Sequence, residues 1–163
     1  MAIILIFQSG VAAAIADCKT PQGIESGVIL TFKGETRQGK SSSARYRLEN
    51  QSASPITVWV LELDGIIYFS GASVGHQYPD INGAWVPHIH SAGSEFDARR
   101  YAIKSYETLE VNCVLPAESA LRFAGGMARL VVKFEENELC VYSTTLKAKF
   151  SKSKFEGIER PGR

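Results

Sequence analysis

The sequence has little net charge and no low-complexity blocks. Eighteen Lys and Arg residues face 17 Asp and Glu residues, which leaves a formal net charge of +1 over 163 residues. A chain this close to neutrality lacks the strong basic field that non-specific nucleic-acid binding requires, so nucleic acid is disfavoured as a partner. Apolar residues make up 45% of the chain, which indicates a folded domain and excludes general disorder.

The sequence also lacks an apolar run long enough to form a membrane-spanning helix. The N-terminal stretch lacks charged side chains and ends in Ala14-Ile15-Ala16, a pattern suited to signal peptidase. We therefore expect residues 1–16 to be a signal peptide, the protein to be secreted or periplasmic, and the mature chain to contain no integral membrane segment. The remainder is expected to comprise a single domain, residues 17–150, and a flexible basic tail, residues 151–163.

Helical periodicity is scarce between Cys18 and Phe150, whereas apolar residues recur at every second position. This alternation predicts an all-β fold, an antiparallel two-sheet sandwich of immunoglobulin-like Greek-key type with one long inserted loop. Asp64-Gly65 predicts a tight hairpin turn, and Trp59 is expected to be a core aromatic residue. The predicted strands cover residues 27–34, 44–50, 56–63, 65–70, 99–104, 107–115, 120–123, 127–134 and 139–150.

Cysteine is rare, with three residues in the chain. Cys113 and Cys140 fall in strand-like segments on faces shared with apolar neighbours, so both side chains are expected to point inward. In an oxidising compartment this predicts a Cys113–Cys140 disulfide, and in a reducing one two buried thiols. Cys18 is left over, and it could pair with either or stay free.

The long loop, residues 70–98, holds all three histidines and is far longer than a usual connection in a compact domain. Its aromatic residues alternate with small polar ones, a mixture typical of protein and sugar recognition loops. We therefore predict a non-enzymatic module that binds a protein or glycan partner through this loop, without a cofactor. An alternative is that Trp85 and Val86 form a short edge strand. The predicted binding residues are Tyr78, Trp85, His88, His90 and Phe96.

Two other functions fit the same loop. In an extended segment His88 and His90 project from one face, and His76 could return as a third ligand, which predicts a zinc or copper site in a cupredoxin-like protein. Asp80 and Asp97 lie near enough in sequence to complete such a set. Ser73 lies in a G-x-S-x-G pattern like that of hydrolase nucleophiles, but the residues after it do not open the helix that this chemistry needs.

Overall fold

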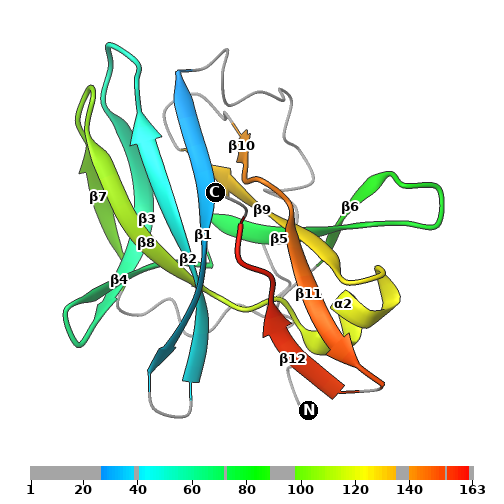
Figure 1. Cartoon of the computed structure of the whole chain (residues 1–163). Helices are drawn as coiled ribbons and strands as arrows, with labels where there is room; N and C mark the ends of the chain where they lie inside the picture. Colours follow the sequence, from blue (N-terminus) through cyan, green and yellow to red (C-terminus); the bar gives the residue numbers. More distant parts are fainter. Residues whose placement is uncertain are drawn as a thin grey trace, which may run out of the picture.

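The computed structural model describes residues 27–38, 41–71, 73–88, 98–134, 140–152 and 154–161. These residues form two six-stranded sheets (Figure 1). The first, in the order β1-β2-β8-β4-β3-β7, comprises β1 (Val28–Gln38), β2 (Ser41–Asn50), β3 (Ile56–Leu63), β4 (Ile66–Phe69), β7 (Arg99–Ile103) and β8 (Thr108–Val114).

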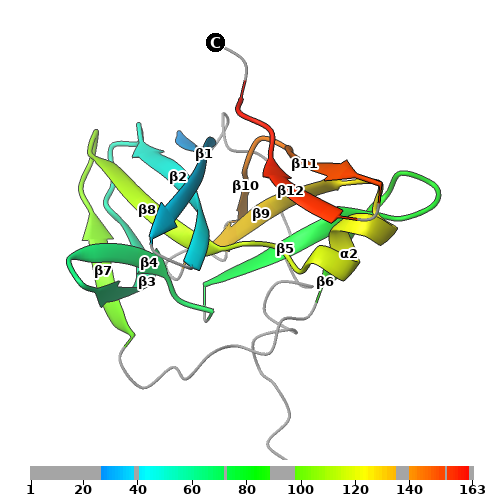
Figure 2. The same ribbon diagram turned by 60° about the horizontal axis from the view of Figure 1, so that its bottom comes forward.

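The second sheet has the order β12-β11-β9-β5-β6, and β10 pairs with β9. Its strands are β5 (Val74–Pro79), β6 (Trp85–His88), β9 (Met127–Lys133), β10 (Cys140–Tyr142), β11 (Leu146–Ser151) and β12 (Lys154–Ile158). A short helix, α2 (Glu118–Phe123), lies between β8 and β9 in the chain. Figure 2 shows α2 beside the second sheet, on the side from which the β5–β6 hairpin projects.

The predicted all-β class is confirmed, because strands make up 64% of the described residues and helix 5%. Two details of the prediction are wrong. β4 pairs with β8 in parallel, at Tyr68 and Asn112, so the sheets are not antiparallel throughout. Residues 120–123, expected to be a strand, belong to helix α2.

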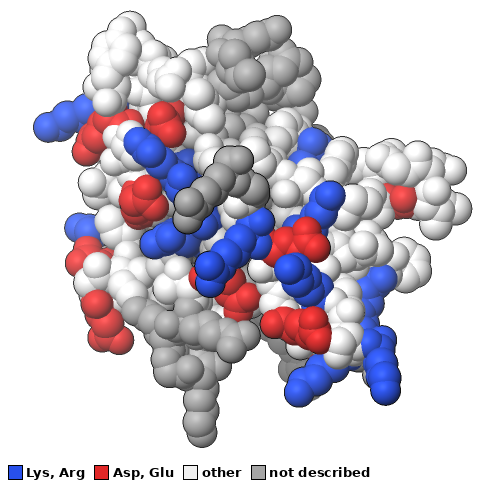
Figure 3. All heavy atoms as spheres, in the orientation of Figure 1, with Lys and Arg blue, Asp and Glu red and all other residues white. Residues whose placement is uncertain are grey.

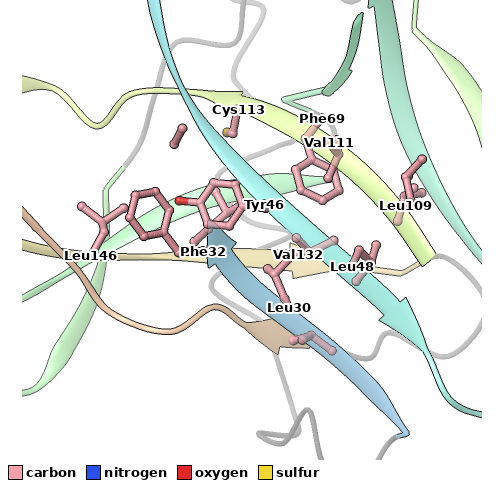
Figure 4. Close-up of a cluster of buried hydrophobic side chains, with 14 of the residues drawn as sticks. Leu30, Phe32, Tyr46, Leu48, Phe69, Leu109, Val111, Cys113, Val132 and Leu146 are labelled. Carbon is pink, nitrogen blue, oxygen red and sulfur yellow. The ribbon is translucent and has the colours of Figure 1, made fainter. Parts of the chain in front are cut away.

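One hydrophobic core lies between the two sheets. Alternate residues of β1 and β2, among them Leu30, Phe32 and Tyr46, meet Val132 of β9 there (Figure 4). The alternation read from the sequence explains this arrangement, because successive side chains of a strand point to opposite faces. The Asp64-Gly65 turn is also confirmed: both residues have positive φ, 52° and 75°, as a tight hairpin turn requires.

Trp59 is not the core aromatic residue that the sequence predicted. Its neighbours Val58 and Val60 are buried in the core, so the period of two puts Trp59 on the outer face of β3. There it pairs with Arg100 of β7, whose guanidinium carbon lies 5.3 Å from the centre of the indole ring. The half-buried indole thus makes a cation–π contact with an arginine of the neighbouring strand.

The predicted disulfide between Cys113 and Cys140 is wrong, because Cys113 is a free, buried thiol. Cys113 lies in the core between the sheets, where it neighbours the first sheet's other apolar side chains. Cys140 instead belongs to a separate cluster with Val131, on the other side of β9 and β10. Val141 is the residue of β10 that faces the core, which leaves Cys140 facing away from it.

The predicted tail does not begin at Ser151. Lys154 to Ile158 form β12, which pairs with β11, and Ile158 is buried. The Ile158 amide donates a hydrogen bond of 3.2 Å to the Glu35 carboxylate, which ties this strand to β1. Within the described ranges, no helix is long and apolar enough to cross a membrane.

Candidate binding site

The segment predicted as a long loop contains a hairpin made of β5 and β6. Tyr78 lies opposite Val86 across the two strands. The turn between them is fixed by Asp80, whose Oδ1 accepts hydrogen bonds of 2.8 Å from the Asn82 and Ala84 amides. β6 lies at the end of its sheet, so the alternative that Trp85 and Val86 form a short edge strand is confirmed.

Helix α2 packs against the body of the protein through Leu121 and Arg122. Leu121 is fully buried and anchors the helix in the core. After the last turn, the Gly126 amide donates a 2.7 Å hydrogen bond to the Leu121 carbonyl. Arg122 is held between Glu118, at 2.6 Å, and the ring of Phe150, whose centre is 4.4 Å from the guanidinium carbon. A helix of six residues gains its order from such contacts rather than from its own propensity.

An apolar groove of about 390 Å³ runs between the hairpin and the helix. The polar residues of its lining are Asp80 and Ser119. Phe123 and Val86 are 85% and 42% exposed, so the groove has apolar side chains in contact with solvent. The apolar part of the lining consists of Tyr78, Pro79, Val86, Pro87, Ala120 and Phe123.

Tyr78 joins the floor of the groove to the core. It is 5% exposed and belongs to the core cluster. Burial raises the pKa of Tyr78 to about 12, and a hydrogen bond with the Ala117 backbone, just before α2, opposes this rise. The phenol is therefore neutral at physiological pH.

Trp85 lies on the other face of the hairpin, away from the groove. It is opposite Pro79, one position from the Tyr78–Val86 pair, so its side chain points the other way. The guanidinium of Arg129 is held between Trp85 and Tyr142, 4.5 Å and 4.0 Å from the two ring centres. Arg129 also donates a 2.9 Å hydrogen bond to the Gln77 side chain. The structure thus separates Trp85 from the predicted binding residue Tyr78.

Two of the three histidines are neighbours across the hairpin. His76 on β5 lies directly opposite His88 on β6, and the His76 side chain is 1% exposed. The His76 ring centre is 6.5 Å from that of Tyr78. His90, Phe96 and Asp97 lie outside the described residues. In the part of the chain that the structure describes, no group of three His, Cys, Asp or Glu side chains could hold a metal ion.

Ser73 serves to connect the two sheets. Its hydroxyl accepts a 3.0 Å hydrogen bond from the Trp59 amide, and its carbonyl accepts one of 2.8 Å from the Lys133 amide. The residue is 2% exposed and is followed by strand β5 rather than by a helix. A raised nucleophile needs the opposite setting, at the exposed start of a helix.

The groove residues from α2 are Ser119, Ala120 and Phe123, and the sequence pattern does not predict them. It predicts a strand over residues 120–123, because a helix of six residues is too short to show helical periodicity. A helix signal is nevertheless present in Glu118 and Arg122, which stand four residues apart and form an ion pair.

The chain matches no protein-family model, and comparison with curated proteins also finds no match.

Proposed function

We propose that this protein is a non-enzymatic binding module, exported from the cytoplasm and built as an immunoglobulin-like sandwich. Its groove between the β5–β6 hairpin and α2 binds an apolar side chain of a protein partner. The observation that carries the proposal is the groove itself: about 390 Å³, lined mainly by apolar residues, with Phe123 and Val86 exposed. That volume lies in the range of ligand pockets, roughly 300–1,000 Å³.

The chemistry of the groove favours a protein over a glycan. A sugar needs several polar side chains around an aromatic platform, and the groove offers Asp80 and Ser119. One Asp80 oxygen is already bound to the Asn82 and Ala84 amides of the turn. An apolar side chain needs no such partners, and its binding would cover Phe123, which is 85% exposed. Figure 3 shows that the projecting hairpin carries almost no charge, while acidic and basic groups mix over the rest of that face.

The edge strand argues for insertion of a side chain rather than for addition of a strand. β6 lies at the sheet edge, where a partner strand could pair. Pro87 stands within its four residues and has no amide hydrogen to donate. Proline on an edge strand also protects against unwanted pairing. Recognition therefore depends on side chains in the groove.

The proposal is tested by selecting peptides from a random displayed library against the full chain and measuring their affinity by calorimetry. We expect the selected peptides to share a large apolar residue. Burying the Phe123 ring is worth about 1.5–3 kcal/mol, so Phe123→Ser should weaken binding about tenfold or more.

Leu63→Ser is the matched control, because Leu63 is an exposed apolar residue, 56% exposed, on the first sheet. It should leave the affinity unchanged. Equal affinity of the Phe123→Ser variant and the wild type would contradict the proposal.

The second candidate is a zinc or copper protein, and the His76–His88 pair favours it. The backbones of the two residues are paired directly across the hairpin, the register in which cross-strand residues are nearest neighbours. Titration of the full chain with each metal distinguishes the two functions. Stoichiometric binding that is lost in His88→Ala and His90→Ala would favour metal handling, and no binding would favour the groove alone.

A further inference from the structure

Arg129 lies on the outer face of the second sheet and is held there from two sides. Leu130 and Val132 of β9 are buried in the core, so the alternation of the strand turns Arg129 outward. β6 lies beyond β5 on one side of β9, and β10 pairs with β9 on the other. From these two strands Trp85 and Tyr142 approach the guanidinium, whose carbon is 4.5 Å and 4.0 Å from their ring centres.

A hydrogen bond fixes the inner nitrogen of the same group. The Arg129 Nε donates at 2.9 Å to the side-chain oxygen of Gln77, a residue that is 7% exposed. A guanidinium carries five N–H donors in a rigid planar fork, and this bond uses one of them. Within the described ranges, the two terminal nitrogens donate no hydrogen bond to the protein. Arg129 therefore keeps a pair of donors for a ligand, in a position that its neighbours define.

The charge of Arg129 also lacks an acidic partner in the part of the chain that the structure describes. Arg47, Arg99 and Arg122 each form an ion pair with a glutamate, whereas no described Asp or Glu lies within ion-pair distance of Arg129. Partial burial lowers the pKa of Arg129, because the cation loses water without gaining a counter-charge. An anion is the kind of ligand that would balance this charge.

We propose that Arg129 binds a carboxylate group of a ligand through its two terminal nitrogens, on the outer face of the second sheet beside Trp85 and Tyr142. The two oxygens of a carboxylate match the guanidinium fork in a bidentate pair. Phosphate groups are usually recognised by clusters of arginines, whereas Trp85, Tyr142 and Gln77 bring no second charge to Arg129. The site lies on the face of the hairpin opposite the groove, so it stands or falls independently of the proposed function.

The carboxylate could belong to an acidic amino acid or to a sugar acid, and small probes distinguish these sources. The full chain, labelled with ¹⁵N, is titrated with N-acetylglutamate methylamide and with glucuronate, while the Arg129 Nε–H and Trp85 indole signals are followed. We expect at least one probe to shift both signals with a Kd of roughly 1–10 mM, and the one that binds identifies the source. N-acetylglutamine methylamide, which has the same shape without the charge, should shift neither signal.

Three results of these titrations would overturn the proposal. They are no shift with either carboxylate probe, equal binding of the glutamate and glutamine probes, and tighter binding of inorganic phosphate than of both carboxylates. All of these comparisons use the wild-type chain, so none depends on whether a variant folds.

Substitution of the arginine tests its role directly. Arg129→Lys keeps the positive charge and removes the planar fork, so the affinity for the carboxylate probe should fall at least about tenfold. Arg100→Lys is the matched control, because it makes the same change in the arginine–tryptophan pair of the first sheet. It should leave the affinity unchanged. Equal affinity of Arg129→Lys and the wild type, with the amide spectrum of the fold preserved, would contradict the assignment of Arg129 as the binding residue.

Discussion

Tyr78 shows how a single residue connects the groove with the core. Its ring lines the groove, while only 5% of its surface is exposed. Because burial disfavours the phenolate, the pKa of Tyr78 in the folded protein rises from its usual value near 10 to about 12. Burial also raises the pKa of Tyr46, so both residues favour a folded state in which the phenols are neutral.

This difference in pKa predicts how stability depends on alkaline pH. As the pH rises above 10, the unfolded chain loses the Tyr78 proton first, so the free energy of unfolding should fall between about pH 10 and 12. Tyr78→Phe should make this decline less steep, as measured by urea unfolding at several pH values. Tyr106→Phe is the control, because Tyr106 is 76% exposed. Parallel declines for the wild type and the Tyr78→Phe variant would show that Tyr78 is not responsible.

Asn50 is a buried polar residue on which three backbone groups depend. Its Nδ2 donates hydrogen bonds to the carbonyls of Ser54 at 2.8 Å and of Ile103 and Lys104 at 3.1 Å each. The Asn50 side chain is 0% exposed, and its hydrogen bond to the Ile103 carbonyl is buried, so water cannot replace that bond.

Substitution of Asn50 by alanine should therefore lower the free energy of unfolding by about 1–3 kcal/mol, since the buried Ile103 carbonyl would lose its donor. Urea unfolding measures the loss. Gln51→Ala, at the exposed neighbouring position, should change stability by less than about 0.5 kcal/mol. A loss as small for Asn50 as for Gln51 would mean that the network contributes little.

At the scale of elements, the position of α2 depends on the two glycines that follow it. Gly125 and Gly126 have φ of 63° and 83°, which residues other than glycine seldom adopt. The two sites differ in space: a Cβ at Gly125 would meet nothing within 4 Å, whereas one at Gly126 would lie 3.1 Å from the Ala148 carbonyl oxygen.

These two sites form a matched pair of substitutions. Gly125→Ala should cost about 1–2 kcal/mol from its backbone conformation alone. Gly126→Ala should cost at least about 1 kcal/mol more, because α2 and β11 must also move apart. Guanidinium unfolding of both variants measures the difference, and equal losses would contradict the close contact between the helix end and β11.

The sequence predicted most of the strands because their alternation is regular, but it left the direction of several residues open. The alternation of Val58 and Val60 indicates that Trp59 lies on the outer face of β3. The prediction of a core position relied instead on the large apolar indole ring. Cys140 lies in a strand of three residues, too short for alternation to fix its face. The strand Lys154–Ile158 was missed because charged residues dominate it. The local pattern does set the face of Trp59, whereas the positions of Cys140 and of the strand Lys154–Ile158 are set by the strands that lie next to them.

For the molecule as a whole, the two sheets provide a frame on which the hairpin and α2 meet. Each element is anchored separately, the hairpin through β9 and the helix through Leu121. The contact between them could not be predicted from the sequence, because residues 78–87 and 119–123 are far apart in the chain. The sequence pattern also predicts a strand rather than a helix at residues 120–123.

A second apolar hollow of about 270 Å³ lies on the first sheet, and its lining includes Leu61, Leu63, Tyr68 and Val114.

The most direct test of the central claim is a map of amide chemical shifts for the full chain, labelled with ¹⁵N, during titration with a selected peptide. The proposal predicts that the largest changes fall on the groove, at Tyr78, Val86, Ala120 and Phe123. Changes concentrated instead at Leu63, Tyr68 and Val114 would place binding in the hollow on the first sheet. That result would contradict the assignment of the groove as the binding site.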